Sequence, residues 1–156
     1  MTKKQDQSQE KAQAPEDQQQ INILKLYCKN SSMEVPNVKT IFSGNWVPDL
    51  NISVSTESKK LEGKNTYNVD LHVKCDVTSN KEKAFTVEIT QCGIFSIPET
   101  DEKTMQHVLG VFCPNVIYPY LREAVTDLVM KAGFPQLALA PINFEMMLEQ
   151  KSQTKN

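Results

Sequence analysis

Residues 113–144 read CPNVIYPYLREAVTDLVMKAGFPQLALAPINF, and the fold of the chain is organised around this stretch. Apolar residues recur at helical spacing between Leu121 and Ala132, which predicts a helix that starts near Pro119 and stops at Gly133. The residues after this helix contain two prolines and yet stay apolar, so they predict a loop with hydrophobic side chains. Such a loop must either pack into a core or offer an apolar surface to a partner.

Upstream of this stretch, three segments alternate between apolar and polar residues, as strands with one buried face do. They cover residues 50–55, 67–77 and 85–90, and polar turns at 62–65 and 79–82 join them as hairpins. Hairpins connect antiparallel strands, of which one face is buried and the other is wet. In the third segment the alternation predicts that Glu88 lies on the wet face.

The first strand candidate, Ile21–Cys28, differs from these because it is apolar on both sides. A strand of this kind is either central in a sheet or pairs with another chain. The connection Lys29–Pro48 that follows it is long, irregular and apolar, and it holds the only tryptophan, Trp46. That residue either anchors the connection in the core or forms one wall of a binding groove.

The remaining helices are short. One is expected to open at Asp101, with Thr100 as its cap, and to end at Pro114; a last one starts after Asn143. Together the elements predict an α+β fold, a four-stranded antiparallel sheet packed with helices. Residues 21–150 form its single domain, between a disordered polar tail at 1–20 and a polar C-terminal tail at 151–156.

Composition excludes several classes of protein. The chain has 156 residues, and its net charge of -2 gives no reason to expect nucleic-acid binding. It contains no apolar run of membrane-spanning length and no secretory signal, so we expect it to stay where it is made. The four cysteines show no metal-ligand spacing, and we expect reduced thiols and no metal or other cofactor.

No constellation of catalytic residues is apparent. His72 falls on the polar face of its predicted strand, His107 lies in a short helix, and no phosphate loop or nucleophile motif occurs. Cys113, before a proline at a helix start, is more simply a small buried residue than a reactive thiol. The sequence therefore predicts a protein that is not an enzyme.

Three blocks resemble one known family. Residues 113–123, CPNVIYPYLRE, and residues 134–144, FPQLALAPINF, are similar to the helix entry and the following loop of the bacterial protein-export chaperone family SecB. Gly93–Ile97, GIFSI, is a third match, and the likeness runs from about residue 21 to about residue 148. The resemblance implies a cytoplasmic chaperone that holds unfolded preproteins for export and delivers them to the translocase ATPase SecA.

The same resemblance implies an assembly and two surfaces. Proteins like SecB are homotetramers, dimers of dimers in which the first strands of neighbouring subunits pair. The client groove would be lined by Met33, Phe42, Trp46, Phe134, Leu137 and Phe144. The SecA-docking face would contain Asn30, Glu34, Thr86 and Glu88. Asn30 stands where the family usually has a carboxylate, so this face carries less charge here.

Two other functions remain open at this point. A SecB-like chaperone could serve an antitoxin or another single partner instead of exported proteins. An α+β domain whose apolar loops line one pocket could bind a small molecule.

Overall fold

The structure is a computed structural model that describes residues 20–155. The predicted N-terminal tail therefore lies almost entirely outside the described residues. The strands are β1 (Asn22–Glu34), β2 (Pro48–Lys60), β3 (Thr66–Ser79) and β4 (Glu82–Ser96). The helices are α1 (Val38–Ile41), α2 (Glu102–His107), the π-helical turn η1 (Val108–Phe112), α3 (Cys113–Lys131) and α4 (Phe144–Thr154).

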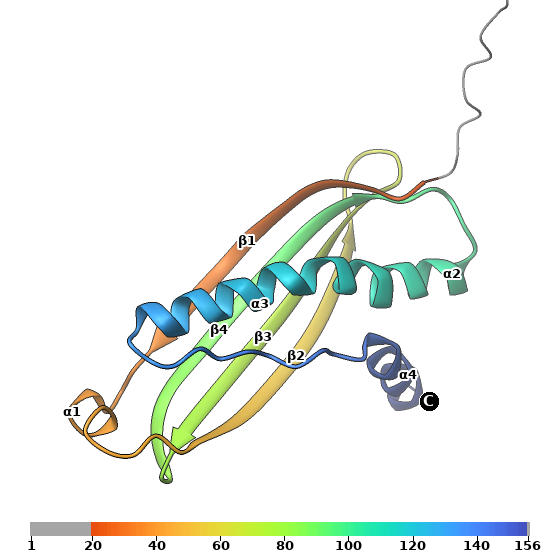
Figure 1. The fold of residues 1–156 in the computed structure, drawn as a ribbon. Helices are drawn as coiled ribbons and strands as arrows, with labels where there is room; N and C mark the ends of the chain where they lie inside the picture. The colour runs from red at the N-terminus through yellow and green to blue at the C-terminus, as the bar shows by residue number, and fades with distance from the viewer. Residues whose placement is uncertain (1–19, 156) are drawn as a thin grey trace, which may run out of the picture.

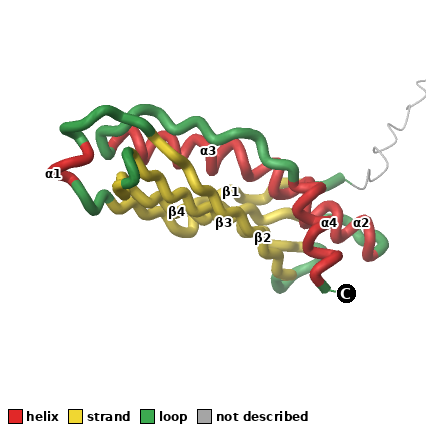
Figure 2. The backbone as a smooth tube through the Cα atoms, turned by 90° about the horizontal axis from the view of Figure 1, so that it is seen from below, coloured by secondary structure: helices red, strands yellow, loops and turns green. Residues whose placement is uncertain are grey.

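The four strands form one antiparallel sheet in the order β1-β4-β3-β2. Figure 1 shows α3 running lengthwise across this sheet, with α1 near one end and α4 near the other. In the view of Figure 2 the helices lie on one face only, and the opposite face of the sheet is bare. We call these the helix face and the open face. The predicted α+β architecture is thus confirmed.

β1 lies at an edge of the sheet, beside β4. Of the two possibilities for this doubly apolar strand, a central position is therefore wrong. β1 is also longer than predicted, since it continues to Glu34, so that Met33 lies in a strand and not in the connection. All four strands extend beyond their apolar alternation, and the added parts of β4 include the buried residues Ala84, Cys92 and Phe95.

The two predicted turns are present. Asn80 and Lys81 both have positive φ, 53° and 67°, which is the backbone twist that a tight hairpin needs. Asn65 and Gly63 adopt positive φ in the other turn. These turns set the register of β2, β3 and β4, and hence decide which residues reach each face.

The helical region differs from the prediction. Asp101, and not Thr100, caps α2, because its carboxylate accepts the backbone N–H of Thr104 at 2.9 Å. Pro114 does not end a helix: helical structure continues from α2 through η1 into α3, with Pro119 in the interior of α3. The π-helical turn just before Pro114 changes the hydrogen-bonding pattern where the proline lacks a donor, which lets the chain continue.

The buried side of α3 packs on the sheet through Ile117, Leu121, Val125 and Val129, each at most 1% exposed. The helix stops at Gly133, whose φ of 90° is left-handed, as predicted. The loop after it packs into the core, where Phe134 is 5% and Leu139 4% exposed.

Two side chains of α3 hold the backbone of this loop. The Thr126 hydroxyl donates to the carbonyl of Leu137 at 3.1 Å, and the Tyr118 hydroxyl donates to the carbonyl of Ala140. The C-terminal residues 151–154, predicted as a polar tail, belong to α4 and are exposed.

Candidate binding surfaces

Four aromatic rings meet where the connection between β1 and β2 reaches the C-terminal loop. The ring of Phe134 lies 4.8 Å from that of Phe42, 5.3 Å from Trp46 and 4.7 Å from Phe85, centroid to centroid. Phe85 and Phe134 are buried, whereas Phe42 is 52% exposed. We call these four residues the aromatic cluster. The rings of Phe85 and Phe134 belong to the core, and the ring of Phe42 faces solvent.

The connection is held in place by polar contacts with the β3–β4 hairpin. The Asn37 amide donates to the carbonyl of Lys83 at 2.9 Å, and the Asn80 amide donates to the carbonyl of Asn45 at 2.8 Å. The side chain of Ile41, 8% exposed, fixes α1 on the core. The exposed ring of Phe42 is therefore presented by an anchored segment.

The predicted groove residues fall into three groups. Phe42, Trp46 and Phe134 lie together in the aromatic cluster. Leu137, in the loop, and Met33, near the end of β1, are both half-buried and pack against the core. Phe144 lies apart from the cluster, at the start of α4.

Phe144 packs edge-on against the ring of Tyr118, with centroids 6.0 Å apart, and it is 1% exposed. This residue therefore anchors α4 in the core and lines no surface in this structure. Two apolar residues of the same connection as Phe42 are instead open to solvent, Val38 at 57% and Val47 at 58%. Their place in the apolar connection was the one signal that could have identified them.

An apolar hollow lies at the other end of the molecule from the aromatic cluster. It has a volume of about 1340 Å³, and β2, β3, α2, η1 and α4 contribute to its walls. Ile52, Met105 and Met147 are among its apolar residues. Sequence patterns did not reveal this groove, because its walls come from elements far apart in the chain.

The four residues of the predicted docking face lie together on the open face. Glu34 of β1 is directly opposite Thr86 of β4, and Ser32 is opposite Glu88. Asn30 is opposite Thr90, so it points to the same side. Directly opposite residues of an antiparallel pair share a face of the sheet, and the expectation that Glu34 reaches the surface of Glu88 therefore agrees with the register.

Further acidic groups extend this surface onto β3. The Thr86 hydroxyl donates to the carboxylate of Asp76 at 2.6 Å, and the ammonium of Lys83 lies 3.7 Å from the same residue. The hydrogen bond from Thr86 is the main reason why the pKa of Asp76 is held below its usual value. Asp76 therefore stays ionised near neutral pH.

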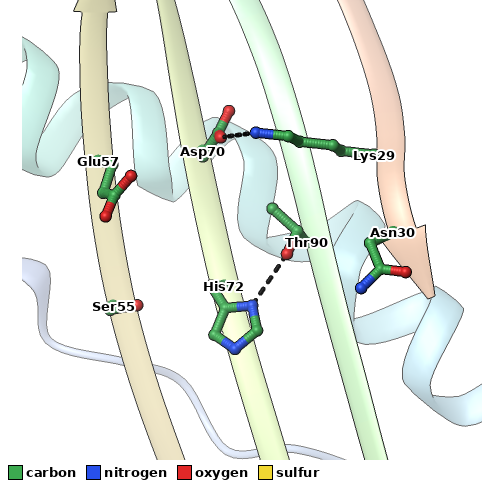
Figure 3. Close-up of a pocket in the computed structure, with 7 residues that line it drawn as sticks. All are labelled: Lys29, Asn30, Ser55, Glu57, Asp70, His72 and Thr90. Carbon is green, nitrogen blue, oxygen red and sulfur yellow. Dashed lines mark hydrogen bonds and ion pairs between the residues drawn. The ribbon is translucent and has the colours of Figure 1, made fainter. Parts of the chain in front are cut away.

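A polar pocket of about 380 Å³ opens beside Asn30 (Figure 3). Lys29 reaches across β4 to Asp70, with a 2.9 Å contact between its ammonium and the carboxylate. His72 lies in the centre and contacts the Thr90 hydroxyl through Nδ1 at 2.9 Å. Glu57 faces the pocket from β2. The prediction that His72 lies on the polar face is confirmed.

The cysteines offer no reactive centre inside the protein. Burial raises the pKa of Cys75 to about 11 and the pKa values of Cys92 and Cys113 to about 12, so these thiols stay protonated and inert. Cys113 is thus the buried residue that was expected. Among residues 20–155, no cluster of side chains suited to a metal ion is found, and no helix is long and apolar enough to span a membrane.

The protein is thus an α+β domain that carries an anchored, partly exposed aromatic cluster on one side of its sheet and an acidic, bare face on the other. Residues 14–155 match the protein family described as "Preprotein translocase subunit SecB", and the chain belongs to this SecB family. Membership makes it a protein-export chaperone and not an enzyme, as the sequence blocks implied.

Individual relatives agree with this assignment. The chain is 41% identical over 136 residues to the protein-export protein SecB of Acinetobacter baumannii strains ATCC 17978 and AYE, covering 87% of this chain and 88% of theirs. Among solved structures, the fold is similar to that of the Mycobacterium tuberculosis Rv1957 SecB-like chaperone in complex with a ChAD peptide from the Rv1956 HigA1 antitoxin. That match has a TM-score of 0.60 at 15% identity and covers 79% of this chain and 88% of the other.

Proposed function

We propose that this chaperone holds unfolded preproteins in the cytoplasm as a homotetramer and delivers them to the SecA translocase ATPase. The observation that carries the proposal is the half-exposed aromatic cluster, in which the Phe42 ring is open to solvent while the connection below it is anchored. Large apolar surfaces presented on a rigid support are typical of binding sites for other chains.

Client binding would use the accessible part of the predicted groove. Phe42 and Trp46 supply apolar area that Phe134 supports from below. The exposed Val38 and Val47 of the same connection and the half-buried Leu137 of the loop would add to it. Burial of apolar area contributes about 25 cal/mol per Å² and is non-directional. Such a surface binds many unfolded sequences and ignores folded proteins, which hide their apolar residues. Several grooves on one tetramer would engage one client at once, so that modest affinities multiply.

Assembly would use the free edge of β1. Ile23 and Leu24 are 50% and 55% exposed on this edge strand, and the edge also presents unpaired backbone groups. On α3, Tyr120 and Met130 are 48% and 56% exposed, which leaves apolar area for contacts between dimers. Pairing through β1 and packing through α3 would together give a dimer of dimers.

Delivery would use the open face, where Glu34 and Glu88 attract a basic segment of SecA. Because Asn30 contributes no charge, the carboxylates of Asp76 and Glu57 on neighbouring strands become more important for the negative potential of this surface. This face is separated from the aromatic cluster by the thickness of the sheet.

The proposal is tested by the fluorescence of Trp46, the sole tryptophan. Addition of a reduced, unfolded client without tryptophan should change this fluorescence, and the Phe42→Ala variant should bind the client more weakly than wild type. Met146→Ala is the matched control, because Met146 is 55% exposed but lies on α4, apart from the cluster. Equal binding by all three proteins would refute the cluster as the client site.

A capture experiment from native cytosol separates the proposal from its alternatives. An export chaperone should recover many unfolded precursors, a dedicated chaperone should recover one partner, and a small-molecule-binding domain should recover none. The identity to export proteins, 41% over most of the chain, favours the first outcome, since the antitoxin-bound structure shares only 15% identity.

A further inference from the structure

His72 contacts a residue of the proposed docking face directly. Its Nε2 lies 3.1 Å from a carboxylate oxygen of Glu88, and its Nδ1 lies 2.9 Å from the Thr90 hydroxyl. The two contacts hold the ring between alternate residues of β4, as Figure 3 shows for Thr90. About a third of the His72 side chain remains exposed, at 34%, so protons from solvent can reach it.

The two charge states of the ring satisfy these contacts differently. A neutral His72 that carries its proton on Nε2 donates to Glu88 and accepts the Thr90 hydroxyl proton on Nδ1, and Glu88 keeps its full negative charge. A protonated His72 donates from both nitrogens. The net charge of the His72–Glu88 pair then rises from -1 to zero, and one Glu88 oxygen is engaged by an internal cation.

Other charged groups face His72 from each neighbouring strand. Lys29 of β1 is occupied by Asp70 of β3, so these two charges largely cancel. Glu57 of β2 lines the same pocket, and Lys74 of β3 is directly opposite Glu88 in the register, so one carboxylate and one ammonium group lie on the neighbouring positions. With these groups balanced, Glu88 is the carboxylate whose availability changes most when His72 gains a proton.

We propose that His72 makes docking to the basic partner pH-sensitive: protonation of His72 neutralises Glu88 and weakens docking, while client holding is unaffected. This inference rests on the proposed docking function of the open face. Histidine is the side chain whose ordinary charge change falls between about pH 5 and pH 8, so docking is compared within this range. Its size corresponds to one exposed ion pair, about a two- to fivefold change in the dissociation constant.

The test compares full-length wild type with His72→Gln, in which the amide keeps the size and hydrogen-bonding capacity of the ring but cannot gain a charge. Binding to purified SecA is measured at low salt between pH 8 and pH 6. Any pH dependence of SecA itself is the same in every comparison. The result is therefore the ratio between the dissociation constants of the two variants at each pH. Wild type should lose about two- to fivefold more affinity than His72→Gln over this range.

The chain supplies its own control. His107 is the only other histidine, and it contacts Glu145 at 2.6 Å between α2 and α4, away from the open face. His107→Gln should therefore retain the full pH dependence of wild type. Client holding, measured in parallel, should stay constant in all variants, which excludes unfolding as the cause.

Two outcomes would overturn the inference. If His72→Gln depends on pH as steeply as wild type, while Glu34→Lys with Glu88→Lys abolishes docking at pH 8, then the docking face is correct and His72 does not control it. If the double variant binds SecA as well as wild type at pH 8, then the docking function itself is wrong and the inference falls with it.

Discussion

Phe134 is the residue on which the aromatic cluster depends, and its removal gives a sharp test of the structure. Phe134→Ala deletes a ring that is 5% exposed and contacts Phe42, Trp46 and Phe85. Replacement of a buried phenylalanine by alanine costs about 3–5 kcal/mol. We expect about 4 kcal/mol, because three other rings lose their partner and cannot collapse together into the cavity.

The companion variant Phe42→Ala removes a ring from the same cluster, but that ring is 52% exposed. Only about half of its transfer free energy is lost, together with one aromatic contact, so about 1–2 kcal/mol is expected. The two variants should therefore have different main effects. Phe134→Ala mainly lowers the free energy of unfolding, whereas Phe42→Ala mainly lowers client affinity.

The assay is urea unfolding followed by far-ultraviolet circular dichroism at one fixed protein concentration. The concentration must be fixed because an oligomer gains apparent stability by mass action. Trp46 fluorescence is unsuitable as the only signal, since both substitutions alter its surroundings. If Phe134→Ala unfolded within about 1 kcal/mol of wild type, or if Phe42→Ala were the less stable of the two, the packing described for the C-terminal loop would be wrong.

Three further predictions address assembly, docking and the thiols. The purified chain should be a tetramer by light scattering, and Ile23→Lys on the free edge of β1 should lower its mass; a stable wild-type monomer at micromolar concentration would contradict the proposed assembly. Glu34→Lys with Glu88→Lys should weaken SecA binding far more than either change alone and leave client binding intact, and wild-type docking should fall as salt rises. Near pH 8 a thiol reagent should modify Cys28, the exposed cysteine, and leave Cys113 unmodified, because burial raises the pKa of Cys113 to about 12; a second rapidly labelled thiol in the native protein would disagree.

The alternation of apolar residues predicted the faces of the sheet well. Val69, Leu71 and Val73 are each at most 1% exposed on the helix face, as the period of two requires. The same pattern placed Glu88 on the open face, and the register then placed Glu34 beside it. These positions follow from local sequence because a strand offers a side chain only two directions.

Helix boundaries and burial in the loops could not be predicted in this way. Local rules end a helix before Pro114, but the chain continues through η1, where the side chain of Leu148 on α4 packs against Gly110. A Cβ on Gly110 would lie 3.0 Å from Leu148, so this glycine permits a contact 38 residues along the chain that no local pattern contains. Phe144 was assigned to the groove from the family resemblance, whereas in the structure its ring packs against Tyr118 and is 1% exposed.

Gly93 gives a physical reason for one block of the family resemblance. A Cβ at this position of β4 would lie 2.5 Å from the ring of Phe95 and 3.2 Å from the side chain of Leu26 on β1. The residue is therefore needed where β1 joins the sheet: any larger side chain would displace the Phe95 ring or the edge strand. The sequence shows the glycine, but only the packing of the two strands shows what it is for.

β4 explains why the two proposed activities can be separated by mutation. Its alternate side chains point to opposite faces, so that Phe85 supports the aromatic cluster while Thr86, the next residue, belongs to the docking face. Substitutions confined to the open face remove solvent-exposed charges and leave the buried side of the strand unchanged. A substitution at Phe85 would instead destabilise the sheet and also weaken the support of the proposed client surface. The two proposed surfaces are thus physically linked through one strand but lie on opposite faces of it, so a client held on one would leave the other open to a second protein.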